Sequence, residues 1–236
     1  MHIITTGDGS KTVFSDRYQQ TYHSTYGAVT ESKTVFIEGS GLSDYLAVAC
    51  QEERSVRVLE IGFGLGLNFL LSADLAMQQQ TQLEYVAIEH DPVSASLMCK
   101  LDYAKWLVHP TLAENLQKWL EPLQTLAPDS PARQTATLTD SGVSLVIHET
   151  LGSQSLACSQ GFDIVYLDAF SPDTNAECWS QTALDSLYGC MKPNATLATY
   201  SARGSVRRGL AAAGFMVTKR PGPPGKREVL KAEKTA

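Results

Sequence analysis

The stretch VRVLEIGFGLGLNFLL (residues 56–71) constrains the fold of this chain more than any other. Its first four residues predict a buried strand, which ends in the acid Glu60. Gly62, Gly64 and Gly66 follow at every second position, and a helix-forming run begins behind them. A strand, a glycine turn and a helix form half of a nucleotide-binding βαβ unit. Glycine lets the backbone approach a bulky ligand, and a helix N-terminus presents free N–H groups.

The glycine spacing separates two kinds of ligand. A dinucleotide fingerprint reads G-x-G-x-x-G, with its third glycine set for helix–strand packing over a pyrophosphate. This chain has E-x-G-x-G-x-G instead. That variant resembles motif I of class I S-adenosylmethionine (SAM) methyltransferases, in which the loop wraps a methionine moiety. A tight strand–helix turn without a ligand has the same local pattern, so the downstream residues must decide.

Size and composition set the class of the protein. A chain of 236 residues with 43% hydrophobic residues fits one large α/β domain, or one domain with an appendage. No apolar run reaches the ~18 residues of a membrane helix, and the N-terminus lacks a signal-peptide pattern. The five cysteines are scattered without a C-x-x-C pair. We therefore expect a cytoplasmic protein with reduced thiols, no metal site and no contact with a membrane.

The charge is unevenly distributed. Residues 203–236 hold nine basic and two acidic residues, a net charge of +7 in a chain whose total is −6. Such asymmetry is typical of a protein that holds a polyanion at one edge. A solvated surface is the alternative interpretation of the same charges.

The pattern of elements divides the chain at residue 54. Residues 1–54 predict a β-rich extension or lid, with strands at Ile3–Thr5, Thr12–Phe14 and Thr34–Ile37 and a helix capped by Ser43. Residues 55–236 predict the main domain, in which strands and helices alternate. Its predicted strands are 56–59, 83–89, 143–147, 162–167 and 195–200, followed by a hairpin of 216–219 and 228–231. Its predicted helices are 68–80, one from Asp91-Pro92, 113–126, 177–190 and 205–213, with a loop over 127–139. This rhythm indicates a Rossmann-like, doubly wound, mostly parallel seven-stranded sheet, as in class I methyltransferases.

Four acids fall at or near strand ends, where such sheets bind their ligands. They are Glu60, Glu89, Glu149 and Asp168. Glu89 follows the second strand, at the position that hydrogen-bonds the ribose in nucleotide enzymes. Glu149 is a candidate for the adenine contact. A solvated strand-end acid is the alternative for Glu89.

Asp168, in the turn YLDAFSP, is the strongest catalytic candidate. A carboxylate beside the sulfonium end of SAM can orient a substrate amine and take its proton. Pro172 fixes the turn. Phe170 and Trp179 could supply apolar walls, although plain core packing is an equal alternative for the tryptophan.

Taken together, the motifs of this chain point to one protein family. LEIGFGLGLNFL, LDAFSP with N-x-E-x-W behind it, SARGSVRRGLAAAGF, PGPPGKRE and the early YHSTYGA all occur in this chain. They resemble the tRNA 5-methylaminomethyl-2-thiouridine methyltransferase family, MnmD and the methyltransferase half of the bifunctional MnmC. The resemblance implies methyl transfer from SAM to the aminomethyl nitrogen of a wobble uridine. It implies tRNA as substrate, no FAD in a chain this short, and the enzymes that make the aminomethyl intermediate as partners.

Site residues carry over from the resemblance by position. The cofactor would contact Glu60, Gly62, Gly64, Gly66, Asn68, Glu89, Glu149 and Phe170. Asp168 would be catalytic. The lid and substrate wall would comprise Tyr22, Ser24, Tyr26, Gly27, Ser171, Pro172 and Trp179. The tRNA would face Arg203, Arg207, Arg208, Lys226 and Arg227. The chain departs from the family pattern at Leu65, at Ala176 and in the sequence HETLG after the third strand.

Two further interpretations remain open at this point. An aminopropyltransferase of the spermidine-synthase type shares the fold and an acid in a similar turn. A non-catalytic RNA-binding module would keep the fold alone. The basic C-terminal segment disfavours a cationic polyamine substrate, and the intact acids and glycines disfavour a module without activity.

Overall fold

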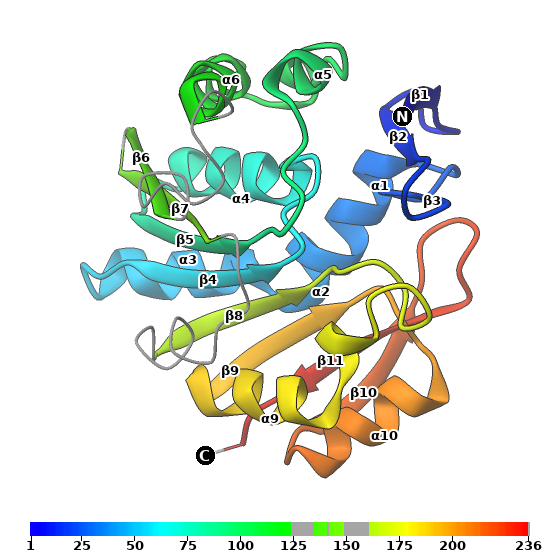
Figure 1. Cartoon of the computed structure of the whole chain (residues 1–236). Coiled ribbons are helices and arrows are strands. Elements are labelled where there is room, and N and C mark those ends of the chain that lie inside the picture. Colours follow the sequence, from blue (N-terminus) through cyan, green and yellow to red (C-terminus); the bar gives the residue numbers. More distant parts are fainter. Residues whose placement is uncertain (124–134, 141, 149–160, 236) are drawn as a thin grey trace.

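An eight-stranded, mostly parallel sheet organises the chain (Figure 1). The computed structural model describes residues 1–123, 135–140, 142–148 and 161–235. The strand order is β10-β11-β9-β8-β4-β5-β7-β6, with β4, β5, β7, β8 and β9 parallel to their neighbours in that group. The strands are β4 (Val56–Ile61), β5 (Leu83–Ile88), β6 (Thr135–Asp140), β7 (Val143–His148), β8 (Phe162–Leu167), β9 (Met191–Thr199), β10 (Met216–Pro221) and β11 (Glu228–Glu233).

The seven expected strands are all present, and the terminal hairpin pairs antiparallel as predicted. The eighth strand, β6, runs antiparallel to β7 at the sheet edge. The prediction of a loop over 127–139 is therefore wrong from residue 135 onward. The segment TATLTD has few apolar residues, and strand pairing, which the sequence does not display, decides its conformation.

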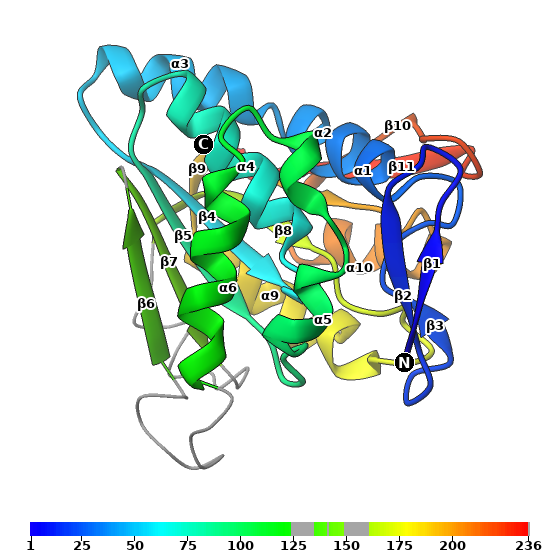
Figure 2. The same ribbon diagram turned by 90° about the horizontal axis from the view of Figure 1, so that it is seen from above.

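Helices cover both faces of the sheet (Figures 1 and 2). Side chains alternate between the faces, so Val58 and Ile164 enter one buried cluster, while Leu59 and Val165 enter the other. The first cluster packs under α3 (Leu42–Gln51), α4 (Leu67–Gln78), α5 (Ala95–Cys99), the 3₁₀ turn η2 (Tyr103–Trp106) and α6 (Thr111–Leu123). The second packs under the 3₁₀ turn η3 (Ala176–Trp179), α9 (Gln181–Cys190) and α10 (Gly204–Ala212). The doubly wound class is confirmed.

The N-terminal extension is half sheet and half helix. A small antiparallel sheet comprises β1 (His2–Thr5), β2 (Lys11–Ser15) and β3 (Gln20–Thr21). Helical turns follow without a strand: α1 (Ala28–Ser32), the π-helical η1 (Lys33–Ile37) and α2 (Glu38–Ser40).

The strand predicted at Thr34–Ile37 is therefore wrong. Val35 and Phe36 are buried in the same cluster as Ala28 and Val29, at the spacing of one helical face. Burial of that face against the main sheet outweighs the β propensity of the branched side chains. The core runs across the boundary proposed at residue 54.

Some predicted helix starts are also wrong. The helix expected at Asp91-Pro92 begins at Ala95, because the Ser94 side chain accepts a hydrogen bond from the Leu97 N–H and caps the first turn. Ser43 lies inside α3, whose N-cap is Gly41 in the left-handed conformation. The single helix expected over 177–190 is η3 followed by α9.

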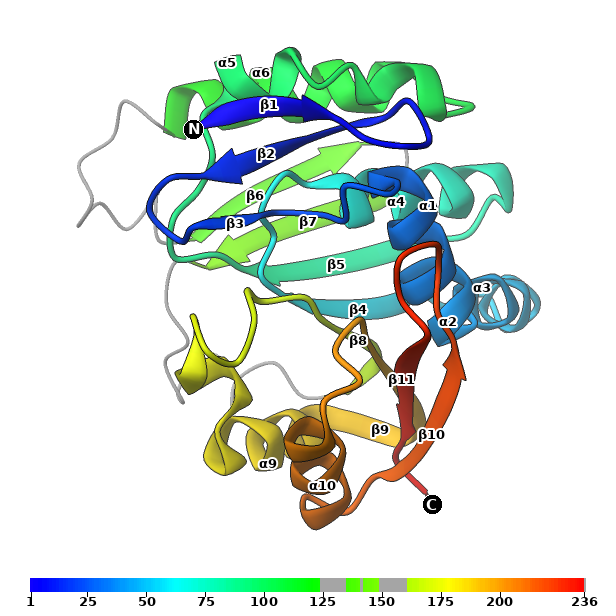
Figure 3. The same ribbon diagram turned by 90° about the vertical axis from the view of Figure 1, so that its right-hand side faces the viewer.

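Two segments lie across the carboxyl ends of the parallel strands. The small N-terminal sheet is anchored there, since Lys11 Nζ donates to the Lys100 carbonyl (2.8 Å) and Tyr103 donates to the Lys11 carbonyl (3.0 Å). The loop between β10 and β11 lies beside α1 (Figure 3). Near the end of β10, Arg220 donates to the Glu38 carbonyl of α2. These segments enclose the strand ends that carry the predicted site.

Candidate active site

The glycine turn after β4 needs glycine at each of its three positions. Gly62, Gly64 and Gly66 all have positive φ, at 92°, 51° and 71°. A Cβ on Gly62 would lie 2.8 Å from the Asp168 carbonyl oxygen, and one on Gly64 would lie 3.0 Å from the Tyr22 ring. The turn is therefore locked against β8 on one side and against the N-terminal extension on the other.

A buried hydrogen-bond network joins two of the predicted acids. The Asn68 amide, in the first turn of α4, donates to Glu60 Oε1 and to Asp168 Oδ2, both at 2.8 Å. The Tyr85 hydroxyl donates to Glu60 Oε2 at 2.9 Å. Glu60 and Asp168 lie at the ends of adjacent parallel strands, β4 and β8, which explains why one amide reaches both.

Burial makes both acids reluctant to ionise. It raises the pKa of Glu60 to about 8, against the lowering effect of the bonds from Asn68 and Tyr85. Burial, with the neighbouring Glu60, holds the pKa of Asp168 well above its usual range. A cation close to two buried acids stabilises their ionised forms, because an opposite charge lowers the pKa of a carboxyl group.

Glu89 closes the glycine turn from the β5 side. Its Oε2 accepts the Gly64 N–H and its Oε1 accepts the Asp91 N–H, both at 2.8 Å. Burial raises its pKa, and these two backbone bonds oppose that shift. Each carboxylate oxygen keeps a second lone pair that can accept a ligand hydroxyl.

These groups face a cavity of about 740 Å³. The strand-end wall of this cavity includes Gly62, Gly64, Glu89, Asp168 and Phe170. The covering wall consists of Tyr18, residues 20–26 and Glu31 of the extension, together with Gly225 and Lys226 of the β10–β11 loop. Volumes of this size hold cofactor-sized ligands.

Aromatic rings join the two walls. Phe170 packs against Tyr18 and Tyr22, with ring centroids 4.5 and 5.0 Å apart. The Tyr22 hydroxyl is buried and lacks a hydrogen-bond partner among the described residues. Gln20 Nε2 donates to Ser171 Oγ (2.8 Å) and Thr174 Oγ1 (2.6 Å), which ties β3 to the turn after β8.

An ion pair closes the covering wall. Lys226 Nζ lies 2.6 Å from Glu31 Oε1 and 4.0 Å from the centroid of the Tyr200 ring. The other oxygen of Glu31 accepts the Ser24 N–H at 2.7 Å. Tyr26 packs directly over Gly225, where a Cβ would lie 2.2 Å from the Tyr26 ring.

Several predicted site residues stand behind the cavity surface rather than on it. Glu60 and Asn68 support Asp168 from within, and Gly66 packs against α5 and α6 through Met98 and Leu116. Trp179 Nε1 donates to the Phe170 carbonyl at 2.8 Å and so holds the turn. Gly27 and Pro172 do not line the cavity. Glu149 lies outside the described residues.

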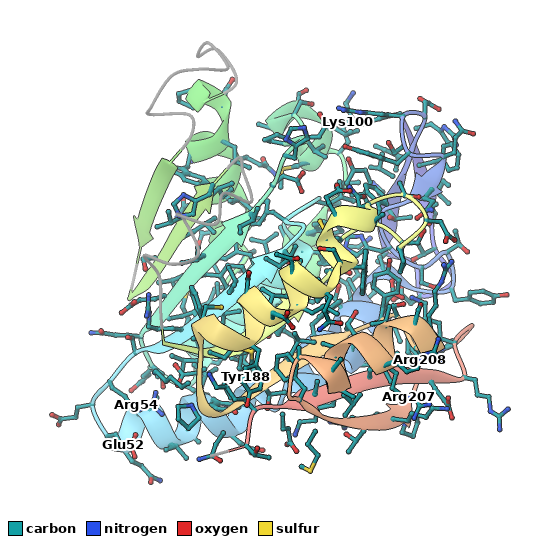
Figure 4. All side chains as sticks on the ribbon, turned by 60° about the horizontal axis from the view of Figure 1, so that its bottom comes forward. Glu52, Arg54, Lys100, Tyr188, Arg207 and Arg208 are labelled. Carbon is teal, nitrogen blue, oxygen red and sulfur yellow. The ribbon has the colours of Figure 1, made fainter. Side chains whose placement is uncertain are left out.

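The predicted tRNA-facing residues separate into two groups. Lys226 is inside the cavity with Glu31. Arg207 and Arg208 are exposed on α10 (Figure 4), and Arg227 is exposed in the β10–β11 loop. Arg203 forms a two-bond ion pair with Asp173 (2.7 and 2.6 Å) at the start of α10.

The cavity residues that were not predicted from the sequence include Gln20, His23, Glu31 and Tyr200. Burial lowers the pKa of His23 to about 4, so its ring is neutral at physiological pH. A buried acid on a short helix and an aromatic residue after β9 carry no local sequence signal. The run rich in Tyr, Ser and Thr at residues 16–32 and the resemblance carried by YHSTYGA pointed to this segment.

Comparison with known proteins assigns the family. The model of the S-adenosyl-L-methionine-dependent methyltransferase family Methyltransf_30 matches residues 114–235, just over half of the chain. The chain belongs to this family. The predicted methyltransferase class and its SAM cofactor are confirmed.

Relatives of this methyltransferase are named as members of the MnmC family, to which the sequence motifs show a resemblance. It is 37% identical to the tRNA 5-methylaminomethyl-2-thiouridine biosynthesis bifunctional protein MnmC of Cupriavidus metallidurans, over 97% of this chain and 33% of the relative. A second MnmC, from Ralstonia nicotianae, is 38% identical over 94% of this chain and 33% of the relative. The chain spans about a third of the length of these proteins, and the predicted resemblance is confirmed.

Solved structures support the fold. The crystal structure of MNMC2 from Aquifex aeolicus superimposes with a TM-score of 0.77 and 24% identity, over 100% of this chain and 70% of that chain. At this level of identity the likeness shows the fold alone. Among the described residues of the methyltransferase, no helix is long and apolar enough to cross a bilayer.

The cavity fits SAM on structural grounds. The glycine turn leaves a cradle at Gly64 that a larger residue would fill, and the strand-end wall presents acids suited to a cationic sulfonium. The Tyr22 hydroxyl lines the cavity and is a buried polar atom without a partner among the described residues, as expected where a polar ligand binds.

Proposed function

We propose that the methyltransferase transfers a methyl group from SAM to the primary amine of 5-aminomethyl-(2-thio)uridine at the wobble position of tRNA. The observation that carries the proposal is the position of Asp168, which lines the cavity beside the glycine turn while Asn68 fixes its carboxylate. The names of the relatives and the exposed arginines of α10 support a tRNA substrate. Such a substrate implies cytoplasmic action beside the enzymes that form the aminomethyl group.

When bound, SAM supplies an electrophilic methyl group on its sulfonium. Asp168 accepts the proton of the substrate ammonium, and the freed nitrogen lone pair forms the N–CH₃ bond as the S–CH₃ bond breaks. The electron pair of that bond stays on the sulfur of the thioether product. Gly62 and Gly64 let the backbone approach the cofactor, and Glu89 accepts hydrogen bonds from the hydroxyl groups of its ribose.

Desolvation of the acids suits this chemistry. A neutral Asp168 becomes a carboxylate more readily when a cation enters the cavity, because opposite charges at close range lower the pKa of a buried acid. The proton that leaves the amine then has an acceptor. Phe170 and Tyr22 exclude water from the reacting atoms, which strengthens these interactions.

The decisive experiment uses labelled SAM and tRNA from cells that lack the modification. The purified protein is incubated with both, the tRNA is digested, and the labelled nucleoside is identified by chromatography and mass spectrometry. We expect label in 5-methylaminomethyl-(2-thio)uridine. Label in another nucleoside, or in added putrescine instead of tRNA, would overturn the proposal, the latter in favour of aminopropyltransferase-like chemistry.

A further inference from the structure

Glu31, Tyr200 and Lys226 form a charged cluster in the cavity that methyl transfer by Asp168 does not use. Glu31 belongs to α1 and its side chain is only 6% exposed. Its carboxylate is held by the Ser24 N–H, and the Tyr200 hydroxyl donates to the Ala169 carbonyl at 2.9 Å. The acid and the ring are therefore fixed parts of the cavity surface.

The third member is held less firmly. The Lys226 side chain is 30% exposed and comes from the loop between β10 and β11. Its ammonium lies between the Glu31 carboxylate (2.6 Å) and the Tyr200 ring (4.0 Å to the centroid). A carboxylate with an aromatic face beside it is a binding site for a primary ammonium.

The cluster lines the same cavity as Asp168, and the Ala169 carbonyl that accepts the Tyr200 hydroxyl belongs to the residue after Asp168. We propose that Glu31 and the Tyr200 ring bind the protonated aminomethyl group of the substrate. Lys226 occupies this site in the free enzyme and leaves when the substrate arrives. The inference rests on the proposed function in taking the substrate to be a primary amine.

Ethylammonium, a small primary ammonium ion that is attached neither to tRNA nor to the protein, tests this assignment. The test is whether it inhibits the Lys226→Ala variant or restores its activity. Lys226→Ala vacates the site, so ethylammonium should compete with tRNA there. It should raise the KM for tRNA by the factor 1 + [L]/Kd of a competing ligand and leave kcat unchanged. Wild-type enzyme should respond only at higher concentrations, because Lys226 holds the site.

The opposite sign would overturn the proposal. If Lys226 only joins the extension to the β10–β11 loop, ethylammonium would restore activity to Lys226→Ala instead of inhibiting it. The absence of any effect would overturn it as well. Lys226→Met keeps the aliphatic stem and replaces the alanine variant if the latter does not fold.

Two further variants complete the test. Glu31→Gln in the Lys226→Ala background should abolish inhibition, and Glu31→Gln alone should raise the KM for tRNA by roughly tenfold or more, as for one lost charge-assisted hydrogen bond. Lys219→Ala removes a lysine of the same hairpin that pairs outside the cavity with Glu228 (2.7 Å). It is the matched control and should show no response to ethylammonium beyond that of the wild type.

A binding measurement without tRNA distinguishes failure of the proposed function from failure of the proposed ammonium site. Ethylammonium should raise the melting temperature of Lys226→Ala and not that of Lys226→Ala/Glu31→Gln. If this shift occurs while tRNA takes up no label, the proposed substrate is wrong and the ammonium site stands. If tRNA is methylated and the shift is absent, the ammonium site is wrong.

Discussion

The two walls of the cavity are built in different ways. The strand-end wall is made from adjacent parallel strands, and its acids are joined by hydrogen bonds through Asn68 and the glycine turn. The covering wall is made from the extension and the β10–β11 loop, which meet through the Lys226–Glu31 pair. Gln20 joins the extension to the turn after β8.

This difference suggests that one wall serves methyl transfer and the other serves substrate binding. The proposed function places the reacting atoms at the strand-end wall, on regular strands, as transfer in one geometry requires. The covering wall is held by side-chain bonds between segments distant in sequence, and our proposals assign it to substrate binding. Variants of the first wall should therefore affect cofactor binding and turnover, and variants of the second should affect substrate binding.

Gly64→Val should have the largest effect. The residue has φ +51°, and its new side chain would enter the space between the turn and the Tyr22 ring. SAM affinity measured by calorimetry should fall at least about 100-fold, a loss of about 2.7 kcal/mol. Gly189→Ala, in α9 with open space where its Cβ would lie, is the control. Normal affinity in Gly64→Val would remove the turn from the cofactor site.

Asp168→Ala should separate binding from turnover. We expect kcat to fall roughly 100-fold, as for loss of a general base, with SAM affinity largely retained. Single-turnover transfer of labelled methyl measures the rate. Asp185→Ala, an exposed acid on α9, should turn over normally. Near-normal turnover in Asp168→Ala would refute the role of the strand-end wall in chemistry.

Charge reversal of Arg207 and Arg208 tests the surface outside the covering wall. The double variant should bind tRNA more weakly, and the slope of log affinity against log salt should become shallower by about 0.7–0.9 for each phosphate that the protein no longer neutralises. Filter binding over a salt series measures it. Reversal of Lys105 and Lys118, in η2 and α6, changes the net charge by the same amount and is the control. An unchanged slope would exclude the arginines from the interface.

Gln20→Ala should loosen the covering wall alone. Each hydrogen bond to Ser171 and Thr174 contributes about 1 kcal/mol, which corresponds to roughly fivefold in affinity. Amide exchange at Thr21 and Tyr22 should accelerate while kcat with bound substrate stays the same. Gln79→Ala removes a comparable bond, to Ser43 on the surface. Equal exchange in both variants would show that this contact does not hold the wall closed.

The last expected effect is on stability and not on binding or turnover. Burial raises the pKa of Glu60 from 4.5 to about 8, so the folded chain binds more protons than the unfolded chain between these values. The stability contributed is present at low pH and is lost as pH rises through this window, by at most about 1.4 kcal/mol per pH unit for one group. That corresponds to about 3–6 °C per unit.

Glu60→Gln removes this titration. Melting curves from pH 5 to pH 8 should therefore be flatter in the variant than in the wild type. Asp168 adds a slope of the same sign in both proteins, because burial raises its pKa as well. Parallel curves would show that Glu60 is not titrated in this window.

The strand-end wall could be predicted nearly residue by residue. Glycine spacing reports backbone conformation directly, and acids that follow buried strands must emerge at one edge of a parallel sheet. The same local logic failed at Val35 and Phe36, where burial imposes a helix on residues with β propensity, and at β6, where pairing imposes a strand on a polar segment.

By itself, the sequence determined the order of seven of the main-sheet strands, the glycine turn and the acids at the strand ends, because each depends on local conformation and side-chain periodicity. Only the tertiary structure decided that Asn68 joins Glu60 to Asp168 and that Lys226 lies on Glu31 instead of outside the cavity. Such contacts join residues far apart in the chain, and no local pattern encodes which partner burial selects.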